Sequence, residues 1–143
     1  MNKKQTQLLQ LAFLISLIAT AGSLFFSDVM KLPPCVLCWY QRVCMYPLVV
    51  VFGLPLVKNV KDSAVYGFTL SLIGFGIAVY HNLLYYKIIP DSITPCTQGI
   101  SCTSRQIEWM GFITIPFLSL IAFLLLSIVC YLIFKSERSY EKQ

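Results

Sequence analysis

The stretch GFITIPFLSLIAFLLLSIVCYLIF, residues 111–134, decides the fold of this chain, because its 24 residues carry no formal charge. A helix rises about 1.5 Å per residue, so about 20 apolar residues cross the roughly 30 Å hydrocarbon core of a bilayer. Three further stretches of this kind precede it, at residues 8–26, 39–57 and 64–86. Since backbone groups in lipid must pair within their own segment, the sequence predicts four transmembrane helices.

The composition of the 143-residue chain agrees with a membrane domain. Hydrophobic residues make up 57% and charged residues 12%, and the mean hydropathy is +0.74, whereas a soluble fold of this size needs more polar surface. We predict an all-α membrane protein, a four-transmembrane-helix bundle that forms a single domain over residues 1–143. The net charge of +5 comes without a clustered basic surface, which indicates contact with membrane lipid and no nucleic-acid partner.

Basic residues are distributed unequally between the two sides that four spans create. Seven lie on the side of the termini and four on the other. The first set is Lys3, Lys4, Lys58, Lys61, Lys135, Arg138 and Lys142, and the second is Lys31, Arg42, Lys87 and Arg105. The positive-inside rule predicts that both termini are cytoplasmic and that loops 27–38 and 87–110 face outward.

The first span has a second interpretation, as a cleavable signal peptide. Lys3 and Lys4, the apolar run and the small residues at 19–21 resemble one. Cleavage would leave three spans and would move no cysteine, and N-terminal sequencing of the mature protein distinguishes the two.

A stripe of small residues runs down one face of the third span. Gly67, Ser71, Gly74 and Ala78 fall at positions i, i+4, i+7 and i+11. Small faces let membrane helices approach closely, so we expect this face to pack against another helix.

Two cysteine pairs fall on the predicted outer side, where disulfides persist. Cys35 and Cys38 are three residues apart at the entrance to the second helix, so their sulfurs can meet. A redox pair, a structural disulfide and half a metal site are the open interpretations, although zinc needs two more ligands. Cys96 and Cys102 close a small loop that is either an exchange-competent disulfide or a staple.

The other two cysteines lie inside predicted spans. Cys44 is six residues beyond Cys38 and faces roughly the opposite side of that helix, and Cys130 is deep in the fourth span. Free buried cysteine behaves as a small hydrophobic residue, so we expect both to be structural.

Arg42 and His81 are ionisable residues within spans, where such residues are costly and usually face a cavity or the bundle interior. Arg42 shares a helix face with the C-x-x-C pair, where a guanidinium would favour the Cys38 thiolate. It either borders a ligand pocket or extends to the interface. His81 is either a satisfied core residue or a hydrogen-bonding partner of an electron acceptor. Two outer dithiols need an electron sink, and a membrane offers a quinone, which Cys38, Arg42 and His81 could frame.

A resemblance to a known family supports this hypothesis. Residues 35–42, CVLCWYQR, resemble the C-x-L-C-[aromatic or apolar]-Y-[QE]-R signature of the DsbB family of membrane thiol:quinone oxidoreductases. The C-x5-C pair, followed by GFITIP at residues 111–116, is similar to the short-loop BdbC-type branch of that family.

The resemblance implies a direction of electron flow. A secreted thioredoxin-fold thiol oxidase of the DsbA or BdbD type would attack Cys96, and the released Cys102 would attack Cys35. Cys38 would then pass electrons to a quinone, menaquinone or ubiquinone. Which of the two outer cysteines meets the partner stays open, because the pair is much closer together here than in longer-loop relatives.

The resemblance also implies which other residues bind the quinone and where the protein acts. Arg42 matches the quinone-contacting arginine, and His81 matches only by its place in the third helix. The expected location is the bacterial inner membrane, with the redox loops on the extracytoplasmic side.

Two rival functions remain at this stage. A vitamin K epoxide reductase-like enzyme also joins four helices to a C-x-x-C and a quinone. Its redox pair lies in the last core helix, however, whereas here the motif precedes the second. A non-catalytic tetraspan scaffold would keep both disulfides permanently oxidised.

Overall fold

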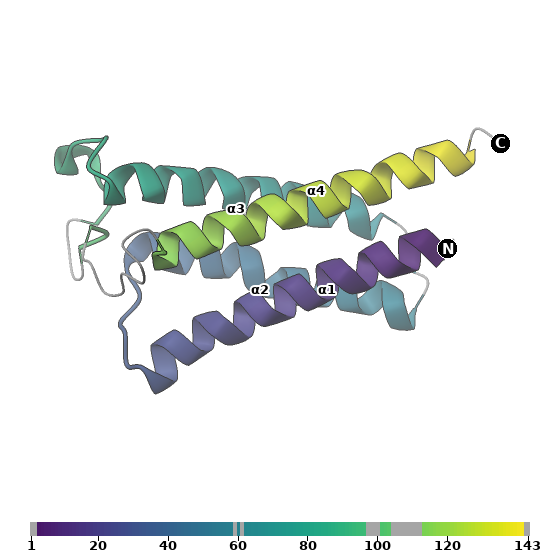
Figure 1. Ribbon diagram of the computed structural model, residues 1–143, viewed down its shortest axis with the longest axis horizontal. Helices are drawn as coiled ribbons and strands as arrows, with labels where there is room; N and C mark the ends of the chain where they lie inside the picture. Colours follow the sequence, from purple (N-terminus) through teal and green to yellow (C-terminus); the bar gives the residue numbers. More distant parts are fainter. Residues whose placement is uncertain (1–2, 59, 61, 97–100, 104–112, 142–143) are drawn as a thin grey trace.

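The computed structural model describes residues 3–58, 60, 62–96, 101–103 and 113–141 (Figure 1). Its long helices are α1 (Lys3–Leu24), α2 (Val36–Val57), α3 (Ser63–Tyr85) and α4 (Ile115–Glu141). The π-helical turn η1 (Phe25–Val29) continues α1, and the 3-10 turn η2 (Asp91–Ile93) follows α3. The described residues form no β-sheet, so the predicted four-helix, all-α architecture is confirmed.

All four helices are long and apolar enough to cross a membrane, which makes this a multi-pass membrane protein. The candidate spans are Lys3–Val29, Val36–Val57, Ser63–Tyr85 and Ile115–Ser139. The helices extend past the predicted apolar stretches at several ends, because a helix can continue through polar residues at the membrane surface. Residues 111–112 of the predicted fourth span, Lys61, Arg105 and much of the 87–110 loop lie outside the described residues.

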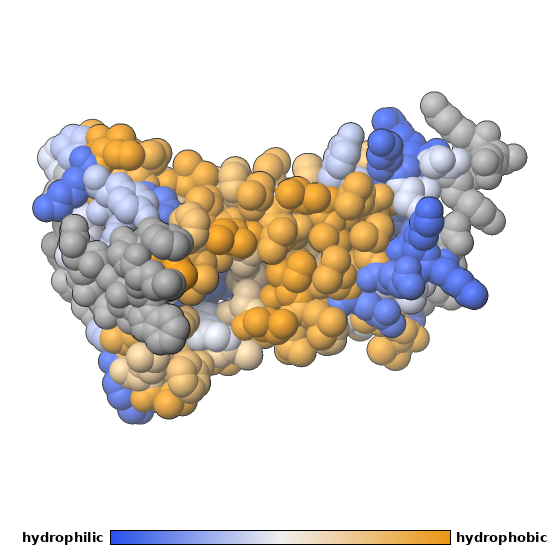
Figure 2. All heavy atoms as spheres, viewed as in Figure 1, coloured by the Kyte–Doolittle hydropathy of each residue, from blue (hydrophilic) through white to orange (hydrophobic). Residues whose placement is uncertain are grey.

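The helices form a bundle in which α1 and α3 each pack against both α2 and α4. Both termini lie at one end, together with the α2–α3 connection (Figure 1). The α1–α2 and α3–α4 connections lie at the opposite end. Apolar residues cover the middle of the visible face, and polar residues gather toward both ends (Figure 2). The two connections that carry the paired cysteines therefore share one end of the bundle.

The small-residue stripe of α3 is buried along its length, which confirms the predicted packing face. A methyl group at Gly67 would lie 2.5 Å from the Phe52 ring of α2. At Gly74 a methyl group would overlap the Phe123 ring of α4. Both phenylalanines are fully buried. The two glycines therefore leave room for these rings, so that α3 can lie close to both α2 and α4.

The start of α4 is fixed by two hydrogen bonds. The buried Thr114 precedes the helix, and its hydroxyl oxygen accepts from the Phe117 N–H at 3.3 Å, as an N-cap does. Asn82 of α3 donates its side-chain amide to the Pro116 carbonyl at 2.9 Å. These bonds hold the first turn of α4 against the C-terminal part of α3, near the cysteine pairs.

Candidate active site

The first cysteine pair lies at the N-terminus of α2. Cys35 is the N-cap residue, and its sulfur accepts a hydrogen bond from the Cys38 N–H at 3.4 Å. The two sulfur atoms are 2.9 Å apart, and both residues are free thiols. The prediction that these sulfurs meet is therefore confirmed.

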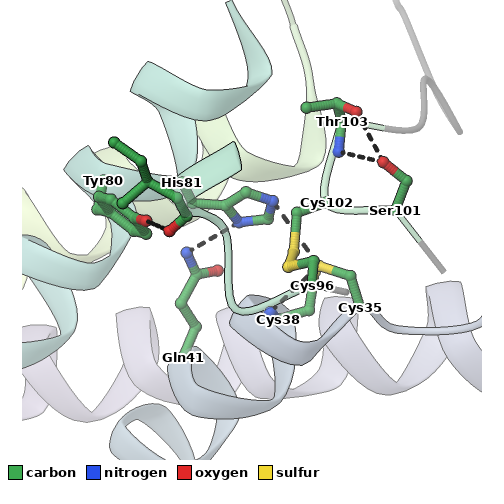
Figure 3. The surroundings of a disulfide bond; sticks show 10 residues. Cys35, Cys38, Gln41, Tyr80, His81, Cys96, Ser101, Cys102 and Thr103 are labelled. Atoms are coloured by element: carbon green, nitrogen blue, oxygen red, sulfur yellow. Dashed lines mark hydrogen bonds between the residues drawn. A yellow bond between two sulfur atoms is a disulfide. The ribbon is translucent and has the colours of Figure 1, made fainter. Parts of the chain in front are cut away.

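His81 of α3 approaches this pair from the side of Cys35. Its Nε2 atom lies 3.7 Å from the Cys35 sulfur, and its Nδ1 atom lies 3.3 Å from the side-chain Nε2 of Gln41 (Figure 3). His81 is 2% exposed and Gln41 is 6% exposed. Sequence reasoning did not single out Gln41. Its signal was an amide three residues after Cys38, at the [QE] position of the signature in residues 35–42.

The second cysteine pair is a disulfide between Cys96 and Cys102, with a Cα–Cα distance of 5.9 Å that suits such a bond. Cys102 is buried, whereas Cys96 is half-buried. Cys102 and Cys35 belong to one buried cluster, which Cys38 and Cys96 border. The pairing within the loop is thus confirmed, and the fold brings the two redox pairs together (Figure 3).

A cavity of about 420 Å³ opens beside Cys38, between α1, α2 and α4. Cys38, Gln41 and Arg42 supply much of its polar lining. Its other walls are mainly apolar side chains, among them Ile15, Ile18, Phe26, Met45, Leu118 and Phe123. His81 is not among the lining residues, although its hydrogen-bonding partner Gln41 is. Contact between His81 and an electron acceptor stays a prediction.

Arg42 borders this cavity, as one of its two predicted placements required. Its guanidinium donates to the Ser23 carbonyl of α1 at 3.1 Å and lies 5.4 Å from the centroid of the Trp39 ring. The cation–π contact and the hydrogen bond hold the charge in place. A fixed positive charge therefore lies at the wall of an apolar cavity that Cys38 also lines.

The contacts of Cys35, one residue before the α2 span, favour its ionised form. The hydrogen bond from the Cys38 thiol lowers the pKa of Cys35 below its usual range, against the opposing effect of burial, and the hydrogen bond from His81 adds to the lowering. Sequence reasoning expected the thiolate on Cys38, because it considered Arg42 without His81. In the dithiol state the hydrogen bonds to its sulfur favour a thiolate at Cys35.

The same three side chains could hold a metal ion in part. The ligand atoms of Cys35, Cys38 and His81 lie within 4.8 Å of one another. A structural zinc site has four ligands, and the described residues supply three in this group. The arrangement is therefore one ligand short of a closed zinc site. Thiol–disulfide exchange requires only that the two sulfurs meet, and they do.

Cys44 and Cys130 lie in the main hydrophobic core of the bundle, in a different buried cluster from the paired cysteines. Both are buried free thiols. Burial in apolar surroundings is typical of unreactive cysteine.

We expect Cys44→Ala and Cys130→Ala to retain turnover within about twofold of the parent, because each removes only a small apolar group. The cost should appear as stability, about 1 kcal/mol each. Steady-state thiol oxidation and thermal unfolding of the purified variants check this. A loss of turnover in a Cys44→Ala protein that remains folded would contradict its assignment to the core.

The comparisons agree with this geometry. The family model described as "Disulfide bond formation protein DsbB" matches residues 5–133. The chain is 42% identical to probable disulfide formation protein C 1 of Bacillus anthracis, over 95% of this chain and 98% of the relative. It is 41% identical to disulfide bond formation protein C of Bacillus subtilis strain 168, over 96% and 99%. No solved structure matches the chain.

Four apolar helices with two adjoining cysteine pairs at one end define a membrane thiol oxidoreductase that forms disulfides. The chain belongs to the DsbB family, whose members generally use quinones and act with a thiol–disulfide partner protein. Family membership thus supports the resemblance found in residues 35–42, and it disfavours both the vitamin K epoxide reductase-like enzyme and the non-catalytic scaffold.

Proposed function

We propose that this chain reoxidises a secreted thioredoxin-fold thiol oxidase of the DsbA or BdbD type and passes the electrons to a membrane quinone. It would thereby support disulfide formation in exported proteins. The observation that carries the proposal is the position of Cys38. Its sulfur lies 2.9 Å from that of Cys35, beside the outer disulfide, and it also lines the apolar cavity.

The exposure of the sulfurs supports an order of exchange. The partner's thiolate attacks the half-buried Cys96, the Cys96–Cys102 bond breaks, and Cys102 leaves as a thiolate. Cys102 then attacks Cys35 of an oxidised Cys35–Cys38 pair, so that Cys38 leaves as the thiolate. Each step exchanges one disulfide for another, and the electron pair moves from the partner toward the cavity.

The cavity suits a quinone in size and in chemistry. About 420 Å³ lies in the range of small-molecule sites, and its walls are mostly apolar with a few polar groups at one side. A bound quinone would accept two electrons and two protons. Cys38 is placed to supply the electrons, and Arg42 is placed to stabilise negative charge on an acceptor oxygen. Menaquinone and ubiquinone both have the required chemistry.

The orientation in the membrane is part of the proposal. We place the protein in the bacterial inner membrane with both termini in the cytoplasm and the cysteine pairs on the extracytoplasmic side. The excess of Lys and Arg at the end that carries the termini supports this, as does the disulfide at the other end.

The test is quinone reduction by purified protein in detergent. A reduced thioredoxin-fold partner is added, and quinone absorbance and partner thiols are followed together. We expect one quinone reduced for each partner disulfide formed. Partner oxidation without quinone reduction would refute the acceptor. No partner oxidation, with the outer disulfide intact, would refute thiol oxidation itself.

The Arg42→Ala variant should bind the quinone poorly but still exchange disulfides with the partner. Losing a charge-assisted contact is expected to raise KM for quinone about tenfold or more. The measurement is KM for quinone alongside the single-turnover rate of partner exchange, with Arg42→Lys as the charge-retaining control. A variant with unchanged KM and slow partner exchange would contradict the role of Arg42 at the cavity.

A further inference from the structure

His81 contacts the sulfur of Cys35, and it does so from outside the cavity. The Nε2–sulfur distance is 3.7 Å, and the cavity is lined by Cys38, Gln41 and Arg42 but not by His81. A buried histidine needs a partner for each ring nitrogen. Here one partner is a redox sulfur, and the other is the amide of Gln41.

The Gln41 contact determines which ring nitrogen of His81 carries the proton. The atom that Gln41 presents to Nδ1 is its amide nitrogen, which can only donate. Nδ1 must then be the acceptor, so in the neutral ring the proton resides on Nε2. That N–H points at the Cys35 sulfur and donates to it. Cys35, His81 and Gln41 thus form a nucleophile, a hydrogen-bonding histidine and a group that orients the histidine.

We infer that His81, held as the Nε2–H tautomer by Gln41, stabilises Cys35 as the thiolate that closes the Cys35–Cys38 disulfide. His81 is then a positioning residue that acts through a sulfur, since it contacts Cys35 and does not line the cavity. The inference rests on the proposed function for the identity of the acceptor, but the state of Cys35 can be measured without any acceptor.

The step balances with the quinone named above. The Cys35 thiolate bonds to the Cys38 sulfur, and the S–H bond of Cys38 breaks. Two electrons pass to the quinone. The quinone also receives two protons. One comes from Cys38, and the other replaces the proton that Cys35 released when it ionised. A disulfide and a quinol result. The thiolate is also the form in which Cys35 must leave when Cys102 re-forms its bond to Cys96.

The groups around Cys35 in the described part of the chain support this assignment. Cys38 from α2 and His81 from α3 are the titratable groups that face it, and the outer disulfide beside it does not titrate. Arg42 is turned to the Ser23 carbonyl on the cavity side. Tyr80 borders the same cluster, but its hydroxyl donates to the Ile93 carbonyl at 3.1 Å.

The experiment titrates the Cys35 thiolate by its ultraviolet absorbance. In a Cys38→Ala, Cys44→Ala, Cys130→Ala background with the outer disulfide intact, Cys35 is the sole free thiol. The ionisation midpoint of Cys35 in this background is the reference for the variants that follow. Adding His81→Ala should raise that midpoint by about one pH unit or more. Gln41→Leu, which keeps the side-chain volume but cannot donate, should raise it in the same direction, and Tyr80→Phe should leave it unchanged.

Turnover of the protein with all its cysteines provides the second measurement. His81→Ala is expected to lower kcat and to leave KM for quinone within about twofold, since it does not line the cavity. An unshifted Cys35 midpoint in both His81→Ala and Gln41→Leu would overturn the inference. If His81→Ala left the Cys35 midpoint unshifted but raised KM for quinone, the inference would be overturned, and His81 would instead be a residue that binds the acceptor. Failure of quinone to be reduced by the parent protein would instead refute the proposed function and leave the titration standing.

Discussion

Replacing Cys38 with alanine is expected to abolish quinone reduction, with a loss of about 10³-fold or more. Cys38 is the sulfur that both contacts Cys35 and lines the cavity. Without it no disulfide can re-form beside the cavity, and no other free thiol lines it in the described part of the chain. The measurement is the rate of quinone absorbance change with excess reduced partner.

Cys44→Ala is the matched control, because it removes a cysteine from the same helix at a position that faces the core. In the Cys38→Ala protein the outer disulfide remains, so we expect a single stoichiometric exchange with the partner and then no further turnover. If Cys38→Ala reduces quinone at a rate near that of the parent, the electron path does not pass through Cys38, and the proposed relay is wrong.

The Gly74→Ala variant is expected to be the most destabilised of the single-methyl changes in α3. The added methyl would overlap the fully buried Phe123 ring, so that ring must move out of its packed position between the helices. Overpacking of this kind typically costs about 1–3 kcal/mol. Thermal unfolding in detergent should show a lower midpoint than that of the parent.

Gly76→Ala is its control, since a methyl there meets nothing within 4 Å. It should unfold at or slightly above the temperature of the parent, because alanine favours the helix over glycine. A Phe123→Leu change, which shortens the obstructing side chain, should recover part of the Gly74→Ala loss. Equal stability of Gly74→Ala and Gly76→Ala would mean that α3 and α4 are farther apart than the structure places them.

The features that the sequence predicted correctly depend on short stretches of chain. Four apolar runs are sufficient to predict four helices, because the bilayer fixes their length and satisfies none of their backbone groups. The meeting of Cys35 and Cys38 follows from one turn of one helix. The packing face of α3 follows from the spacing of its glycines, although the identity of its neighbours does not.

The features that the sequence did not predict depend on how separate helices pair. Depth alone placed His81 and Arg42 at one pocket, but His81 contacts the Cys35 sulfur, whereas Arg42 contacts the Ser23 carbonyl at the cavity wall. The role of Gln41 was not predicted because it depends on a contact with His81 of α3. The spacing of residues within α2 carries no information about that contact. The contribution of α1 to the cavity wall was equally hidden. It gives a reason for retaining this helix in the mature protein, because cleavage would remove that wall.

The unequal burial of the two sulfurs in the outer disulfide has a consequence for selectivity. A thiol that approaches from the water reaches the half-buried Cys96, whereas Cys102 is covered by the same cluster that holds Cys35. Small cellular thiols lack the surface to stay docked while the second exchange occurs, so their mixed disulfides would more often revert than proceed. Under the proposed function, the burial of Cys102 would therefore favour a protein partner that stays bound through both exchanges over a small thiol that does not.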